Sequence, residues 1–272
     1  MHLTNQLLSP ATEIVGGAVA ALLVAVAIAK TRRQATRNTL PMMGALGAFV
    51  LAAQMLNFTA FAGSSGHLIG GVLLAAMLGP WAGFLTLSVV IAIQALLLGD
   101  GGTLAIGCNI LNMAAAGCLV AYPLIFKPLM KGRSGGVRLV LASVVAAMVA
   151  AELGAIGAVA EVGASGVAPL QMRAFWGNMV FAHLPIGAVE GLATGAILWA
   201  VSQTNAPLLH INFVGEGAEQ PRVLNTVWAF LIGALLIGGG LSHLSSDRPD
   251  GLEWSVEQSQ EEIQNSEFSI HN

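Results

Sequence analysis

Long apolar runs separated by short polar stretches dominate the chain. An α-helix of about 17–25 apolar residues is long enough to cross a bilayer. The pattern therefore predicts helices at 12–30, 40–57, 104–126, 139–159, 175–201 and 223–241. A further run at 68–98 is longer than one crossing needs, and Gly79-Pro80 lies in its middle. Because proline interrupts the helical hydrogen-bond ladder, we expect a short helix at 67–78 followed by a full one at 80–98.

Composition agrees with this pattern, since 56% of the residues are hydrophobic, only 9% are charged and the mean hydropathy is +0.77. A soluble domain has about 25% charged residues. The predicted fold is therefore all-α: a polytopic integral membrane helix bundle surrounded by lipid, with about seven core helices plus one C-terminal helix. A formal net charge of −3, without clustered basic and aromatic residues, argues against a nucleic-acid partner.

The basic residues orient these helices. If the loop at 31–39 is cytoplasmic, all Lys and Arg residues fall on the inside except Arg173 and Arg248. This is a strong positive-inside bias. It predicts a multi-pass protein of the bacterial inner (cell) membrane whose N-terminus and C-terminus are external. The loop at 58–67 then lies on the same external face as the N-terminus.

The chain divides into three parts. A transmembrane bundle at 1–201 is followed by a linker at 202–222, which contains Pro207 and Pro221, and by a single helix with a polar tail at 223–272. The end of the chain is rich in Asp and Glu. Because acidic tails of low hydrophobicity are usually disordered and solvated, we expect this tail to be exposed on the external side.

The N-terminus carries the most distinctive chemistry. The α-amine of Met1, the backbone nitrogen of His2 and the His2 imidazole can close two small chelate rings around one cation, and the imidazole of His67 can complete a plane of four nitrogens. Ni²⁺ and Cu²⁺ favour square-planar nitrogen ligands, whereas Mg²⁺ and Ca²⁺ favour oxygen. The ordinary alternative is a solvated His2 and a His67 that is hydrogen-bonded at a helix start.

Other polar residues within the apolar runs have two interpretations. Glu152, His183 and Glu190 lie within the apolar runs, where ionisable residues are functional candidates. They form either a proton path or a second cation site. The alternative that we favour is a hydrogen-bonded pair of His183 and Glu190 inside the bundle. Several polar residues near the histidines orient ligands or join helices: Gln54, Asn57, Ser64, Ser65, Asn109 and Asn112. The glycine-rich stretch at 99–102 lacks the lysine of a phosphate loop, and no hydrolase spacing is found.

Small residues recur at four-residue spacing on the first helix, at Gly17, Ala21, Ala25 and Ala29. Such a stripe lets another helix approach closely. The second helix belongs either to this chain or to a partner, and the sequence leaves both open.

Several stretches together point to a known family: Met1-His2, GALGAFVLAAQMLNF at 44–58, GSSGHLIGG at 63–71, LGPWAG at 78–83 and QALLLGDGGTLAIGCNILNMA at 94–114. They resemble the substrate-binding membrane component of nickel and cobalt energy-coupling-factor (ECF) transporters, the NikM/CbiM type. PDGLEW at 249–254 resembles the small auxiliary subunit, the NikN/CbiN type, here fused through the linker.

The resemblance implies a transport subunit and not an enzyme. It implies that Met1, His2 and His67 bind Ni²⁺, while Co²⁺ is the alternative substrate. Among the polar residues named above, we expect Asn57, Ser64, Ser65 and Asn109 to support these ligands. It also implies that the stripe on the first helix docks a transmembrane coupling protein and that two cytoplasmic ATPase subunits drive uptake. We expect the tail to assist loading or assembly.

Two departures from the family pattern stand out. Leu3-Thr4-Asn5-Gln6 replaces the acidic residue that often follows Met-His, and the auxiliary segment has one helix where two are usual. Two other classes of function stay open. One is a proton-coupled secondary metal carrier that uses His183, Glu190 and Glu152. The other is a metal sensor or intramembrane enzyme with the tail as its receptor part.

Overall fold

The structure is a computed structural model that describes residues 2–61, 63–132, 135–210 and 223–270. Within these ranges five helical segments are long and apolar enough to cross a membrane. They are α1 (Pro10–Gln34), α4 (Pro80–Ile93) with η2 (Gln94–Leu98), α5 (Ile106–Asn109) with η3 (Ile110–Phe126) and α6 (Lys127–Met130), α7 (Gly136–Ser165), and α8 (Met172–Asn205) with η4 (Ala206–Leu208). The shorter helices are η1 (Asn5–Leu7), α2 (Thr39–Gln54), α3 (Gly71–Leu78), α9 (Val223–Gly239), η5 (Leu241–Leu244) and α10 (Gly251–Ile270).

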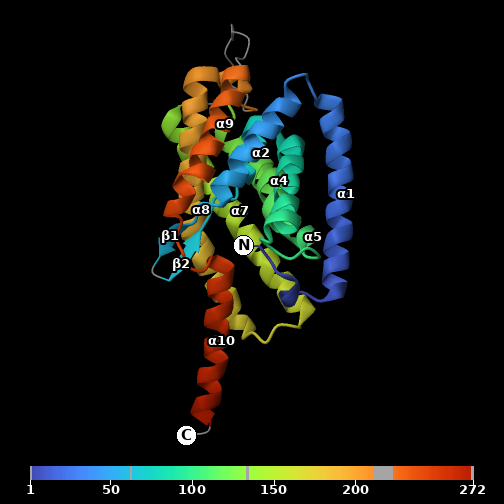
Figure 1. The fold of residues 1–272 in the computed structure, drawn as a ribbon, viewed down its shortest axis with the longest axis vertical. Helices are drawn as coiled ribbons and strands as arrows, with labels where there is room; N and C mark the ends of the chain where they lie inside the picture. The colour runs from blue at the N-terminus through green and yellow to red at the C-terminus, as the bar shows by residue number, and fades with distance from the viewer. Residues whose placement is uncertain (1, 62, 133–134, 211–222, 271–272) are drawn as a thin grey trace.

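The predicted all-α membrane bundle is confirmed (Figure 1). The long apolar run divides where proline predicted it, because α3 ends at Leu78 and α4 begins at Pro80. Gly79 between them has φ +81°, a backbone conformation that glycine adopts without steric cost. The short helix begins at Gly71 and not at 67, since Gly70 has φ +85° and the segment before it is extended.

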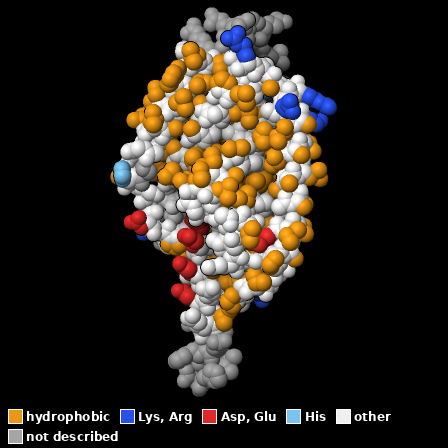
Figure 2. Space-filling model, turned by 45° about the vertical axis from the view of Figure 1, so that its right-hand side comes forward, with side chains coloured by type: hydrophobic (Ala, Val, Ile, Leu, Met, Phe, Trp, Pro, Cys, Tyr) orange, Lys and Arg blue, Asp and Glu red, His pale blue; other side chains and the backbone are white. Residues whose placement is uncertain are grey.

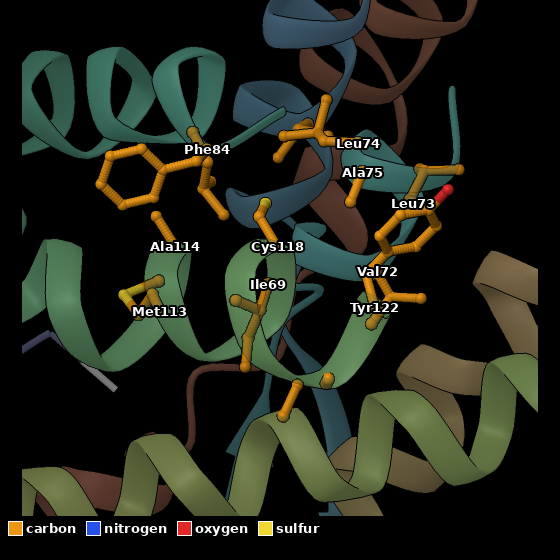
Figure 3. Packing of buried hydrophobic residues seen from close by; sticks show 14 of the residues in the cluster. Ile69, Val72, Leu73, Leu74, Ala75, Phe84, Met113, Ala114, Cys118 and Tyr122 are labelled. Atoms are coloured by element: carbon orange, nitrogen blue, oxygen red, sulfur yellow. The ribbon is translucent and has the colours of Figure 1, made fainter. Parts of the chain in front are cut away.

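Helix α3 lies at the centre of the bundle, and every residue from Gly71 to Met77 is buried. Figure 3 shows its apolar side chains facing Phe84 of α4 and Tyr122 of η3. The backbones of α3 and η3 approach closely, because a Cβ atom at Gly71 would lie only 2.9 Å from the Cα of Gly117. This buried helix follows directly after the loop that carries His67, and so fixes the end of that loop.

Helices α7 and α8 pack along a stripe of glycines. Gly187, Gly191 and Gly195 recur at four-residue spacing on α8 and lie against the backbone of α7 at Met148, Val144 and Val140. Such a repeat permits close helix contact in a membrane, where packing and not hydrophobicity drives association. This contact fixes the position of α8 against α7.

A small hairpin and the C-terminal segment meet at one side of the bundle. Strands β1 (Phe58–Phe61) and β2 (Ser64–Gly66) pair in antiparallel orientation, and Ser65 of β2 forms a parallel bridge with Asp250. From this bridge α10 packs on α8 and continues beyond the bundle (Figure 1). The tail predicted to be disordered and solvated is therefore helical, and Leu252, Ser255 and Ser259 are buried at its start. The expected exposure holds only for the face of α10 that carries Glu253, Glu257 and Glu261.

Charged side chains separate along the long axis of the molecule. Figure 2 shows most of the visible Lys and Arg side chains at the upper end and Asp and Glu in the lower half, with apolar side chains covering much of the surface between them. This distribution is the one expected for a bundle whose middle lies in lipid.

Replacing Gly191 tests the α7–α8 contact. Gly191→Ala places a Cβ against the Cα of Val144, which is backbone and cannot move aside. Overpacking of this kind costs about 1–3 kcal/mol, so thermal unfolding in detergent should shift to lower temperature. Gly177→Ala is the matched control, because Gly177 lies on the same helix with no atom within 4 Å of its Cβ position. Equal midpoints for both variants would contradict close packing at Gly191.

Candidate metal centre

His2 and His67 come together from two distant parts of the chain. Their rings stack with centroids 5.4 Å apart and planes inclined by 17°. Both residues are 7% exposed. The N-terminal segment and the loop before α3 therefore meet at one buried point, as the sequence-based hypothesis requires. Met1, the third predicted ligand, lies outside the described residues.

Hydrogen bonds fix the segment behind His2. Asn109 of α5 accepts from the Leu3 backbone nitrogen (2.8 Å) and donates through Nδ2 to the Leu3 oxygen (3.1 Å). The same oxygen accepts from the Gly102 nitrogen (2.9 Å), and Asn5 Oδ1 accepts from the Leu104 nitrogen (3.1 Å). Because a buried backbone group without a partner is costly, these contacts specify where the N-terminus enters the bundle.

Asp100 stands beside His2, in the glycine-rich loop between η2 and α5. Its Oδ1 lies 3.2 Å from His2 Nδ1. Gly101 has φ +94°, and a Cβ there would lie 3.2 Å from that of His2, so glycine lets the loop reach the imidazole. Burial alone would raise the pKa of Asp100, but the hydrogen bond to His2 and the electrostatic interaction with it outweigh burial and lower that pKa. Asp100 is therefore a carboxylate and keeps a negative charge next to His2.

The tautomer of His67 is set by the backbone oxygen of the next residue, Leu68. Its Nδ1 lies 3.2 Å from the oxygen of Leu68, which can only accept, so Nδ1 carries the proton and Nε2 has the lone pair. Burial lowers the pKa of His67 from 6.5 to about 3. The ring is therefore neutral near pH 7, as a metal ligand must be.

The backbone after His67 is held from two helices. Gln54 Nε2 of α2 donates to the Ile69 oxygen (2.9 Å), and Glu190 Oε1 of α8 accepts from the Gly70 nitrogen (2.9 Å). One peptide unit is thus bound on both sides, which fixes the position of His67.

The PDGLE stretch covers the other side of this loop. Ser65 donates through its backbone nitrogen to the Pro249 oxygen (2.8 Å) and through Oγ to the Arg248 oxygen (2.8 Å). Asp250 Oδ1 accepts from the Glu253 nitrogen (2.9 Å), while Glu253 Oε2 accepts from the Asp250 nitrogen (3.1 Å). This reciprocal pair is a capping box that starts α10.

Aromatic contacts anchor the same stretch. Trp254 packs edge-on against Phe61 of β1, with centroids 5.0 Å apart, and lies near Phe181 of α8. Its indole nitrogen would be 3.1 Å from a Cβ at Gly63, so the hairpin needs glycine there. The C-terminal segment is therefore part of the site's surroundings.

The other predicted residues have separate partners. Asn57 binds Ser245 and Ser246 through its backbone, and Ser64 Oγ donates to the Ser65 oxygen. No hydrogen bond within the described ranges joins Glu152, His183 and Glu190 to one another, since His183 binds the Met179 oxygen and Glu190 binds Gly70. The hydrogen-bonded His183–Glu190 pair that we favoured is thus wrong.

Sequence reasoning missed the two acidic residues beside the histidines. The glycine-rich loop of Asp100 contains no motif that predicts a contact with His2, and the acidic composition around Asp250 predicts a solvated tail. Among the described residues, no three His, Cys, Asp or Glu side chains are placed to hold a metal ion.

The fold and this N-terminal site define a polytopic membrane transport component. The chain belongs to the family described as the cobalt uptake substrate-specific transmembrane region, which matches residues 2–208. It is thus a substrate-binding ECF membrane component of the NikM/CbiM type and not an enzyme. A second family model, the PDGLE domain, matches residues 224–272.

Similar proteins agree with this assignment. The fused nickel transport protein NikMN of Rhodobacter capsulatus is 30% identical over 269 residues, which cover 94% of this chain and 76% of that protein. The probable fused nickel transport protein LarMN of Lactiplantibacillus plantarum is 41% identical over 45% of this chain, and the match spans only 38% of that relative. A crystal structure of a truncated transition metal transporter matches with a TM-score of 0.66 and 31% identity, covering 75% of this chain and 99% of that one.

Asn109→Ala tests how the N-terminus is held. It removes both hydrogen bonds to Leu3, so the segment should be released and metal affinity should fall about 10–100-fold, as when a residue that orients ligands is lost. Titration of Ni²⁺ into the purified protein with its native N-terminus measures this. Asn112→Ala is the control, since Asn112 lies on the same continuous helix but binds Glu161. Unchanged affinity in Asn109→Ala would show that Asn109 does not hold the site.

Proposed function

We propose that this protein is the substrate-capture component of an ATP-driven nickel uptake transporter. It binds Ni²⁺ through the Met1 amine, the His2 amide and imidazole, and the His67 imidazole, and Co²⁺ is the alternative substrate. The observation that carries the proposal is the stacking of His2 on His67 at a buried point. The nickel in the names of the two fused relatives, and the Ser-Gly-His-Leu context of His67, support nickel.

The chemistry of the chelate assigns a role to Asp100. Only Nδ1 of His2 closes a six-membered ring with the His2 backbone nitrogen, and Nδ1 faces Asp100 in the structure. Metal binding therefore exchanges the Asp100 contact for the cation. The carboxylate stays beside the ligands, where it balances positive charge, and so supplies from another loop the acidic group that the family often has after Met-His.

The distribution of charge supports external termini. Basic side chains gather at one end of the molecule (Figure 2), which the positive-inside rule assigns to the cytoplasm. The acidic half, toward which α10 runs, then faces outside. In this orientation the cation arrives from outside, and two cytoplasmic ATPase subunits act from the opposite end.

The stripe on α1 supports a docking surface for the transmembrane coupling protein. Ala21, Ala25 and Ala29 are exposed, so packing within this chain does not use them. Gly17 differs, because the Cβ position of Gly107 falls against its backbone. Helix α1 stands at the edge of the bundle (Figure 1), where a partner helix can reach its outer face.

Inserting one alanine between Met1 and His2 tests the chelate. The insertion adds a second backbone amide between the amine and the imidazole, so the first three residues alone can supply the four nitrogens of a planar Ni²⁺ complex. The yellow, diamagnetic band should therefore need His67 in the native sequence but not in the insertion variant. Absorption spectroscopy of the metal-loaded proteins, each with and without His67→Ala, checks this. If His67→Ala in the native sequence keeps an unchanged spectrum, the proposed ligand set is wrong.

Ala25→Leu tests docking without touching the metal. The larger side chain fills the stripe, so co-purification with the coupling protein should fall while Ni²⁺ binding stays unchanged. Val19→Leu is the control, because Val19 is 43% exposed on the same helix but lies outside the four-residue repeat. A stable complex with Ala25→Leu would place the partner on another surface.

A further inference from the structure

A cavity of about 10 Å³ adjoins His67 on the side closed by the C-terminal segment. His183 of α8 and Asp250 and Gly251 at the start of α10 also line it. A cavity of this size has room for about one water molecule. The nitrogen and oxygen donors around it include two imidazoles and a carboxylate, a set that suits a divalent transition metal. The chelate proposed above uses only His67 of these three.

His183 is oriented as metal-binding histidines usually are. Its Nδ1 lies 2.7 Å from the Met179 oxygen, which can only accept, so Nδ1 carries the proton and Nε2 has the lone pair. Nε2 faces Gly251, whose Cβ position would lie only 3.3 Å away. In metal-binding histidines, the ring nitrogen that does not bind the metal commonly donates its proton to a group such as a backbone carbonyl. His183 itself is 1% exposed.

The backbone holds Asp250 in the wall of the cavity that the C-terminal segment forms. Its Oδ1 accepts from the nitrogens of Leu252 and Glu253, at 2.8 and 2.9 Å. Pro249 just before it is bound to Ser65, two residues from His67. The carboxylate therefore cannot leave the cavity unless the C-terminal segment separates from β2. Gly251 allows this close approach, because a Cβ there would also lie 3.0 Å from Ile186 of α8.

From this arrangement we propose that His183 and Asp250 form an outer transfer site, at which the incoming cation exchanges water for protein ligands before it reaches His67. The proposal rests on the function proposed above. A hydrated ion is larger than the cavity, so it must lose water to enter. An imidazole and a carboxylate replace the lost water ligands. Since no group of three His, Cys, Asp or Glu side chains in the described part of the chain is placed to hold a metal ion, the proposed binding there is transient.

Rapid mixing of Ni²⁺ with the full-length protein, with its native N-terminus, tests this role. The rate at which the absorption band of the planar complex develops reports loading, and its final shape reports the chelate. Asp250→Asn and Asp250→Ser should each slow loading about tenfold, the low end of the effect of a charged cleft on association rates. His183→Gln removes a nitrogen ligand and no charge, and it should also slow loading. The final spectrum should stay unchanged. Asn and Ser both serve as N-caps, so α10 keeps its start.

Two exposed residues of the same segment provide controls. His243→Gln and Asp247→Asn make the same chemical changes outside the cavity and should load at the wild-type rate. Wild-type loading rates in His183→Gln and in both Asp250 variants would overturn the transfer site. An altered final spectrum would overturn it as well, since these residues would then belong to the chelate. Failure of the chelate itself is distinguishable, because His67→Ala would then retain the band.

Discussion

The structure depends on one constraint: His2 and Leu3 are buried at the bundle, where each backbone group needs a partner. Asn109 meets this demand by bonding Leu3 on both its donor and acceptor sides, and Gly102 adds a second donor to the Leu3 oxygen. These bonds leave the segment one position, and that position puts His2 on His67. The position of His2 next to His67 is therefore set by hydrogen bonds to the backbone of Leu3 and not by the histidine side chains themselves.

Helix α8 connects the parts of the site. It holds the loop after His67 through Glu190, packs Ile186 against Gly66, and presents His183 to the C-terminal segment. Its glycine stripe fixes it against α7, so these contacts share one rigid element. A displacement of α8 would move the loop that carries His67 and the cover formed by the PDGLE stretch together. This geometry explains why a fused C-terminal segment, distant in sequence, is structurally part of the metal-binding bundle.

Much of the fold could be predicted from the sequence, since a transmembrane helix is specified by local properties. Apolar length located the spans, and Gly79-Pro80 located the break between α3 and α4. The start of α3 was misplaced because the left-handed conformation of Gly70 depends on contacts with Gln54 and Glu190, which lie far away in sequence. The helix in the tail was missed because composition reports solvation but not the capping box of Asp250 and Glu253.

By itself, the sequence determined that this is an all-helical membrane protein with a Met-His start and a loop bearing His67, because hydrophobic length and proline act locally or through the lipid. Only the tertiary structure decided which polar groups surround those histidines. Asp100, Asn109, Glu190 and Asp250 come from four separate segments, and nothing in their local sequence states that they converge. Their convergence follows from long-range packing, in which each buried donor finds its acceptor once the helices have met.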